Sequence, residues 1–81
     1  MVLLDIRVPA IDRIYDFELD EEIQVGELLK KIVQMIKEKE EIVTDKEEKL
    51  YLYAFQSEKV LRESDSLKQQ GVKSGETLFL I

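Results

Sequence analysis

Cysteine, histidine and tryptophan are absent from the 81 residues of this chain. Without cysteine the chain forms no disulfide and no thiolate zinc site. Without histidine it lacks the commonest general base, a frequent metal ligand and the usual switch near neutral pH. Catalytic pairs of the Ser-His or Cys-His type are therefore excluded. We expect no enzyme activity, no cofactor and no metal.

Long hydrophobic segments are absent as well. No apolar run approaches the roughly 20 residues that span a bilayer. The opening residues 1–4 lack the basic start and long apolar centre of a signal peptide. We therefore expect no direct membrane insertion and a cytoplasmic location. The length predicts a single domain over residues 1–81.

Acidic residues outnumber basic ones, 18 to 12, and the excess is local. Residues 1–29 hold eight acids and two bases, a net charge of −6, whereas residues 30–81 hold ten of each. Nucleic-acid binding requires clustered Lys and Arg, so we expect no nucleic-acid partner. The acidic first third is either a solvated surface or a docking face for a basic partner. The candidate acidic docking face consists of Asp16, Glu18, Asp20, Glu21 and Glu22.

The first half of the chain predicts two strands followed by a helix. Apolar residues alternate with other residues over 2–8 and again over 14–19, the period of a half-buried strand. Pro9 ends the first strand because it has no amide hydrogen to donate, and residues 9–12 are predicted to form the hairpin loop. From Val25 to Lys39 the apolar residues follow helical spacing. The predicted helix stripe is Val25, Leu28, Leu29, Ile32 and Ile36, broadened by Val33 and Met35.

The second half predicts shorter elements. Residues 38–49 are almost wholly charged, and we interpret them as a connecting loop. Alternation predicts strands at 50–55, 59–61 and 77–81. Asp65 and Ser66 are predicted to cap a brief helical turn at 67–70, which Gly71 ends. Gly75 is expected to turn the chain into the last strand.

The resulting order, β-β-α-β-β-β, predicts an α+β fold in which one helix packs across a mixed sheet. Three strings add a more specific resemblance: Val-Gly-Glu-Leu-Leu-Lys-Lys-Ile at 25–32, the stretch at 61–72 that ends in Gly-Val, and Ser-Gly-Glu-Thr-Leu at 74–78. In this order and over nearly the whole chain, they resemble the ubiquitin-like β-grasp fold. That resemblance implies that the final strand is central, between the first and the third.

Within that fold, a stand-alone domain of this length that ends at Ile81 without Gly-Gly is similar to the YukD-like (EsaB-like) proteins. This resemblance implies a bacterial, cytosolic accessory or regulatory component of a type VII secretion system. We expect a binding module rather than a conjugated tag, because an activating enzyme would find no Gly-Gly tail. One alternative is a small non-catalytic β-grasp subunit of a multicomponent enzyme such as an oxygenase. Another is a sulfur carrier or protein modifier, if the native chain extends beyond Ile81.

A candidate protein-binding face lies on the side of the sheet that the helix leaves open. If Leu52 and Leu80 point toward the helix, their odd-numbered neighbours point outward. An uncovered antiparallel face is normally polar, so apolar residues there indicate a partner, which includes a second copy of the chain in a homodimer. The alternative is cross-strand packing that only stabilises the sheet. By resemblance, Phe79 and Ile81 fall where two residues of ubiquitin's recognition patch lie. The candidate face consists of Leu3, Tyr51, Tyr53, Phe79 and Ile81.

Overall fold

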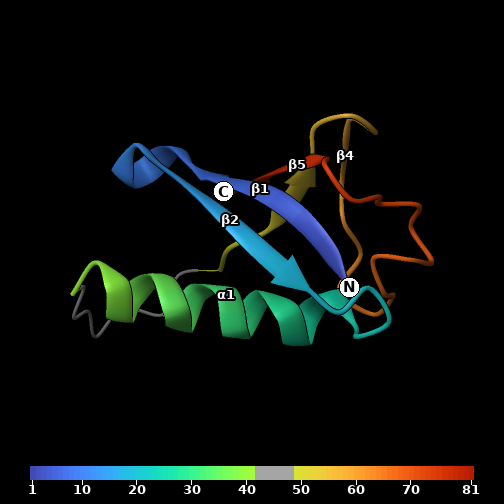
Figure 1. Cartoon of the computed structure of the whole chain (residues 1–81), viewed down its shortest axis with the longest axis horizontal. Helices are drawn as coiled ribbons and strands as arrows, with labels where there is room; N and C mark the ends of the chain where they lie inside the picture. Colours follow the sequence, from blue (N-terminus) through green and yellow to red (C-terminus); the bar gives the residue numbers. More distant parts are fainter. Residues whose placement is uncertain (42–48) are drawn as a thin grey trace.

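A five-stranded mixed sheet with one α-helix across one of its faces makes up the described part of the chain (Figure 1). The computed structural model describes residues 1–41 and 49–81. The strands lie in the order β2-β1-β5-β3-β4, with β1 and β5 parallel and the other neighbours antiparallel. The last strand is therefore central, as expected for a β-grasp sheet. The elements are β1 Val2–Val8, the 3-10 turn η1 Pro9–Ile11, β2 Arg13–Leu19, α1 Val25–Lys39, β3 Leu52–Ala54, β4 Lys59–Val60 and β5 Thr77–Leu80.

The β1–β2 hairpin follows the alternation seen in the sequence. Its inward-facing side chains are buried and its outward-facing side chains are mostly exposed, so the predicted strand faces are confirmed. Pro9 opens the connecting turn, and Asp12 completes it with a left-handed backbone at φ 51°. Aspartate tolerates this conformation better than most residues with a Cβ. The inward-facing residues are Val2, Leu4, Ile6, Val8, Tyr15, Phe17 and Leu19.

The helix has the predicted bounds, and its stripe faces the sheet. Val25, Leu28, Leu29, Ile32 and Ile36 are all buried, with Ile32 at 0% exposure. Met35 differs from the prediction, because 53% of its surface is exposed. It lies on the flank of the stripe, over the outer edge of β2, where no further described strand covers it. The predicted loop at 38–49 falls largely on residues 42–48, which lie outside the described residues, and α1 itself continues to Lys39.

The start of the helix is capped from a distant part of the chain. Gln24 at the N-cap position makes no side-chain capping hydrogen bond. Instead the Val25 amide donates to the Asp65 carbonyl at 2.9 Å, and the Gly26 amide donates to the Glu63 carbonyl at 3.0 Å. A Cβ on Gly26 would lie 3.3 Å from that same Glu63 oxygen. Glycine lowers helix stability, and its presence at position 26 is explained by the close approach of the backbone of residues 63–65, which leaves little room for a side chain.

The stretch after β4 contains the predicted helical turn at 67–70, in which the Gln70 amide lies within hydrogen-bond distance of the Ser66 and Leu67 carbonyls. Ser66 caps it as predicted, because its Oγ accepts the Gln69 amide at 3.1 Å. The Gly71 amide then donates to Lys68 and the Val72 amide to Leu67, while Gly71 adopts φ 74°. These are the two hydrogen bonds of a helix C-terminal Schellman motif, which here closes immediately after the cap. The segment is too short to propagate a helix, and burial of Leu67 holds it in place.

The third strand is shorter than predicted, although its backbone hydrogen bonds extend one residue beyond it at each end. Regular pairing covers Leu52–Ala54, against an expected 50–55. Backbone bonds to the neighbouring strand continue on both sides, from the Tyr51 amide to the Ile81 carbonyl at 2.6 Å and from the Phe55 amide to the Thr77 carbonyl at 3.0 Å. The register established by β3 and β5 therefore extends from Tyr51 to Phe55, and it fixes which side chains share the outer face of the sheet.

Candidate functional site

Three aromatic rings lie together on the face of the sheet that α1 does not cover. Tyr53 of β3 is directly opposite Phe79 of β5 in the register, and their ring centroids are 6.4 Å apart. Phe55 lies one step along, with its ring centroid 6.0 Å from that of Phe79 and 57% of its surface exposed. Both pairs are tilted and within the distance range of favourable aromatic contacts. We call Tyr53, Phe55 and Phe79 the outer aromatic cluster.

Phe55 is the member of this cluster that the sequence prediction missed. The signal was present, because Phe55 continues the same period-two alternation as Tyr51 and Tyr53. The predicted strand at 50–55 includes Phe55, whereas the predicted outer face omits it. Phe55 is the most exposed of the three rings, because Tyr53 and Phe79 are partly buried.

Tyr51 and Ile81 extend the cluster at one end. Their backbones exchange two hydrogen bonds, so they form a directly opposed pair beyond Tyr53 and Phe79. Both side chains are exposed, in agreement with their predicted outward direction. The Nζ of Lys49 lies 5.5 Å from the centre of the Tyr51 ring and 2.6 Å from the Glu63 carboxylate. That hydrogen bond to Glu63 raises the pKa of the Lys49 ammonium, so the cation beside the ring stays charged at neutral pH.

Leu3 is on the same face but apart from the aromatic rings. Its carbonyl accepts the Gly75 amide, whereas Phe79 is level with Arg7 of β1. Leu3 and Arg7 are four residues apart on β1, so Leu3 lies roughly 13 Å from the level of Phe79 along the strand direction, at 3.3 Å per residue. Asp5, paired with Thr77, lies between them. The five residues of the predicted face therefore divide into four that adjoin one another and an isolated Leu3.

The predicted acidic docking face also divides into two parts. Asp16 and Glu18 are exposed on the outward side of β2 and make no ion pair with the other described residues. Asp20, Glu21 and Glu22 lie in the turn before α1. There Glu21 is 3.8 Å from the terminal amine and Glu22 is 3.8 Å from the Nζ of Lys68. Asp16, Glu18 and Asp20 are thus the members of the set without an ion pair in the described residues, and Asp20 accepts the Glu22 amide.

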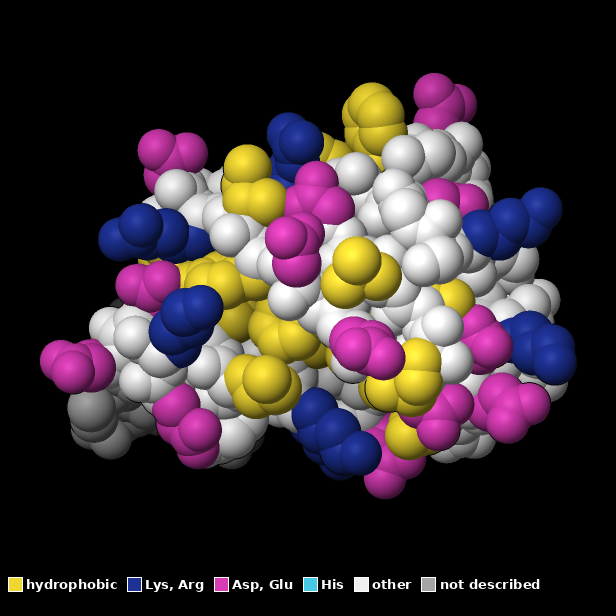
Figure 2. All heavy atoms as spheres, viewed as in Figure 1, with side chains coloured by type: hydrophobic (Ala, Val, Ile, Leu, Met, Phe, Trp, Pro, Cys, Tyr) yellow, Lys and Arg dark blue, Asp and Glu magenta, His cyan; other side chains and the backbone are white. Residues whose placement is uncertain are grey.

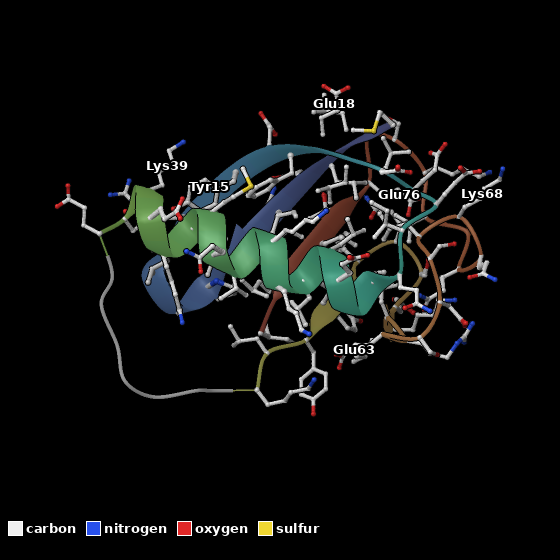
Figure 3. All side chains as sticks on the ribbon, turned by 90° about the horizontal axis from the view of Figure 1, so that it is seen from below. Tyr15, Glu18, Lys39, Glu63, Lys68 and Glu76 are labelled. Carbon is white, nitrogen blue, oxygen red and sulfur yellow. The ribbon has the colours of Figure 1, made fainter. Side chains whose placement is uncertain are left out.

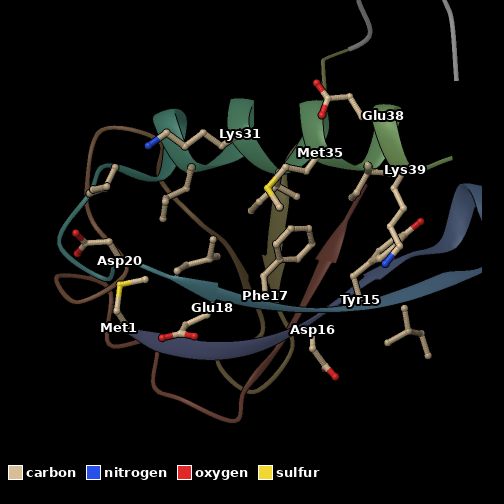
Figure 4. A pocket seen from close by; sticks show the side chains of 16 residues that line it. Met1, Tyr15, Asp16, Phe17, Glu18, Asp20, Lys31, Met35, Glu38 and Lys39 are labelled. Carbon is tan, nitrogen blue, oxygen red and sulfur yellow. The ribbon is translucent and has the colours of Figure 1, made fainter. Parts of the chain in front are cut away.

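A groove runs beside Asp16 and Glu18, between β2 and α1, with a volume of about 1000 Å³. Apolar side chains fill the band between the helix and β2 (Figure 2). Phe17 of β2 and Met35 of α1 face each other across it, while Asp16 points away from the helix (Figure 4). The groove therefore has an apolar lining beneath a charged outer surface.

One end of the groove is closed by contacts of Tyr15. Its hydroxyl donates to the Glu40 carboxylate, and the Nζ of Lys39 lies 5.3 Å from the centre of its ring. Tyr15 and Lys39 are near the C-terminal end of α1, whereas Glu63 is near its N-terminal end (Figure 3). Burial, followed by the hydrogen bond to Glu40, raises the pKa of the Tyr15 hydroxyl, which therefore remains a donor at neutral pH.

Among residues 1–41 and 49–81, His, Cys, Asp and Glu form no group of three that could hold a metal ion. In the same ranges no helix is long and apolar enough to cross a membrane.

The sheet order and the helix across it define a ubiquitin-like β-grasp domain, as the sequence predicted. The EccD5 ubiquitin-like domain from Mycobacterium xenopi superposes with a TM-score of 0.74 at 15% identity, over 99% of this chain and 91% of that one. The ubiquitin-like domain of Plasmodium falciparum Dsk2 gives 0.72 at 20% identity, over 98% and 93% of the two chains. The N-terminal ubiquitin-like domain of the 4931431F19Rik protein gives 0.68 at 24% identity, over 99% and 72%.

The family is identified by a second comparison. Residues 3–80 match the family described as "WXG100 protein secretion system (Wss), protein YukD". The chain therefore belongs to the YukD family, and the resemblance drawn from its sequence is confirmed. No curated protein sequence matches the chain significantly.

Proposed function

We propose that this chain is a non-catalytic, ubiquitin-like protein-binding module that acts as an accessory or regulatory component of a bacterial type VII (WXG100) secretion system. Membership of the YukD family supports the secretion context. The observation that carries the binding role is the outer aromatic cluster, a set of apolar rings on a sheet face that α1 leaves open. The proposed location is the cytoplasm, with which the cysteine-free composition is compatible.

The exposure of the cluster favours a binding role over a purely structural one. Cross-strand aromatic pairs stabilise a sheet by roughly 0.2–1 kcal/mol each, and Tyr53 with Phe79 meets that description. Phe55, however, leaves more than half of its surface in water. Covering a ring of this size with a partner removes a large apolar area from water, and aromatic residues are frequent anchors of protein interfaces. The proposed binding face is therefore Tyr51, Tyr53, Phe55, Phe79 and Ile81.

The surroundings of the cluster indicate what kind of partner fits it. On the β1 side it is bordered by Arg7 and Asp5, whose side chains are 3.4 Å apart. An apolar centre with a polar rim is the usual anatomy of a protein interface. The proposed partner is a protein of the secretion machinery, and a second copy of this chain is the other occupant that the experiment must separate from it.

Replacing Tyr53 or Phe79 with serine is expected to weaken partner binding by at least about tenfold while the fold is retained. The reason is that these two rings form the centre of the face, whereas the core lies on its other side. Tyr53→Ser loses one aromatic pair and Phe79→Ser loses two, at about 0.5–1.5 kcal/mol each, which should lower the melting temperature only moderately. Binding would be measured by capture of secretion components on the immobilised chain, and self-association by sedimentation velocity.

Leu3→Ser is the matched control, because Leu3 is 54% exposed on the same face but apart from the rings. It should leave both capture and self-association unchanged. If Tyr53→Ser and Phe79→Ser unfold the chain, or if they fold and capture the same components as the parent, the rings are structural and the proposed binding face is wrong.

A further inference from the structure

The outer edge of β2 has backbone groups without a neighbouring strand among the described residues. β2 is the first strand in the sheet order and pairs with β1 alone. The Asp5 amide and the Leu3 carbonyl form hydrogen bonds on the β5 side of β1. Backbone groups alternate in direction along a strand, so those of Leu4 and Ile6 point toward β2.

The register then identifies the free groups. Leu4 is opposite Phe17 and Ile6 is opposite Tyr15, so the backbones of Phe17 and Tyr15 point inward to β1. By the same alternation the amides and carbonyls of Ile14, Asp16 and Glu18 point away from the sheet. The free backbone groups of these three alternate residues can form hydrogen bonds with one more strand.

The groove beneath this edge supplies an apolar surface for such a strand. Met35 contributes a side chain that is 53% exposed at the border of the core stripe. It faces Phe17 across the groove (Figure 4). The helix rim also carries Lys31, Glu38 and Lys39, so side chains that enter from an added strand meet apolar atoms inside the groove and charges of both signs at its rim. Uncharged apolar side chains fit that position.

The outward side of the same edge has the opposite character. Asp16 and Glu18 project there, exposed and without an ion pair in the described chain. Side chains of an added strand on this side would lie about 5 Å from them, the spacing of neighbouring strands. Basic side chains fit there, since opposite charges on neighbouring strands are stabilising.

We propose that the open edge of β2 and the groove between β2 and α1 bind an extended polypeptide segment whose apolar and basic side chains alternate, by adding it to the sheet as a further strand. The apolar set packs into the groove between Phe17 and Met35, and the basic set lies beside Asp16 and Glu18. The edge backbone provides affinity, and the two contrasting sides provide specificity.

The charges also argue against a second copy of this chain as the occupant. Two β2 edges paired about a two-fold axis would bring Asp16 and Glu18 of each copy next to those of the other. Like charges on adjacent strands are destabilising, and charged edges are a common device against self-pairing. A heterologous basic segment has no such penalty. This site is separate from the outer aromatic cluster, so either proposal stands without the other.

The test uses the full chain, labelled with nitrogen-15, and an acetylated and amidated peptide of alternating lysine and valine, seven residues long, that starts and ends with lysine. Binding should slow hydrogen exchange of the Ile14, Asp16 and Glu18 amides by at least about tenfold. A peptide with glutamate in place of every lysine should bind at least about tenfold more weakly. Affinity for the lysine peptide should fall as salt rises, because the charges are exposed.

Two variants examine the two sides of the site separately. Met35→Gln should weaken peptide binding by about tenfold through loss of apolar contact, and Asp16→Lys should weaken it by slowing association. Leu3→Gln, at a similar exposure, and Tyr53→Ser, in the aromatic cluster, should leave it unchanged. The proposal is overturned if the lysine peptide does not bind at millimolar concentration, if the glutamate peptide binds as well, or if the edge amides become protected without peptide as the chain self-associates.

Discussion

Ile32→Ala is expected to lower the free energy of unfolding by roughly 2–5 kcal/mol, the range for truncating a fully buried aliphatic side chain. Ile32 has 0% exposure and lies at the centre of the stripe by which α1 contacts the sheet. The substitution removes apolar burial and leaves a cavity that the strands beneath it cannot readily fill. In a domain of this size the loss is a large fraction of the total stability. Urea unfolding followed by circular dichroism would measure it.

Lys31→Ala is the control for Ile32→Ala, because Lys31 is next to it in sequence and exposed. Its effect should stay below about 0.5 kcal/mol. Similar denaturant midpoints for the two variants would contradict the packing of α1 on the sheet as described.

Gln70→Glu is expected to destabilise the folded chain by roughly 2–4 kcal/mol at pH 7, although the two side chains have nearly the same shape. Gln70 is 5% exposed. Its Oε1 accepts the Arg62 amide at 2.7 Å, and its Nε2 donates to the Arg62 carbonyl at 2.8 Å. A carboxylate would keep the first bond. In place of the second, one of its oxygens would face the Arg62 carbonyl oxygen in a buried site, where two acceptors repel each other.

The penalty should depend on pH in a defined direction. Burial and the Arg62 carbonyl both disfavour the charged form, so the pKa of the new carboxyl should be higher in the folded chain than its usual value of about 4.3. Below both pKa values the protonated acid donates to the carbonyl, and the penalty should nearly vanish. It should grow as the pH rises from about 4.3 through the folded pKa. The measured quantity is the difference in unfolding free energy between variant and parent at pH 4 and pH 7.

Gln24→Glu provides the matched control for Gln70→Glu. Gln24 is exposed and makes no side-chain capping bond, so the same added charge should change stability by less than about 0.5 kcal/mol. A Gln70→Glu penalty that is equally large at pH 4 would show that the penalty does not arise from the hydrogen bond between the Gln70 side chain and the Arg62 carbonyl.

The features that the sequence predicted correctly are those set by short-range periodicity. Alternation fixed the inward and outward sides of the strands at once, because slipping a strand by one residue reverses all of its side chains. The helical stripe predicted α1 with the bounds that the structure has, Val25–Lys39. The same alternation correctly assigned four residues to the outer face: Tyr51, Tyr53, Phe79 and Ile81.

The features that escaped prediction depend on contacts between distant residues. The cap on Val25 and Gly26 comes from the backbone of residues 63–65, which carries no side-chain signature. Alternation shows which face Leu3 occupies but not its row, and the row is set by the pairing of β1 with β5. The exposure of Met35 likewise follows from where the sheet ends beneath the helix. The position of Phe55, by contrast, could have been predicted from its spacing.

The central place of β5 sets the order in which this chain can complete its fold. Without β5 the sheet separates into a β1–β2 hairpin and a β3–β4 hairpin that share no direct pairing. β1 meets β5 through pairs such as Ile6 with Leu78, near opposite ends of the chain. On the ribosome the early hairpin therefore lacks the second neighbour of β1 until residues 77–80 have left the exit tunnel. Folding should begin after synthesis of the domain, and its rate should reflect closure of this long loop.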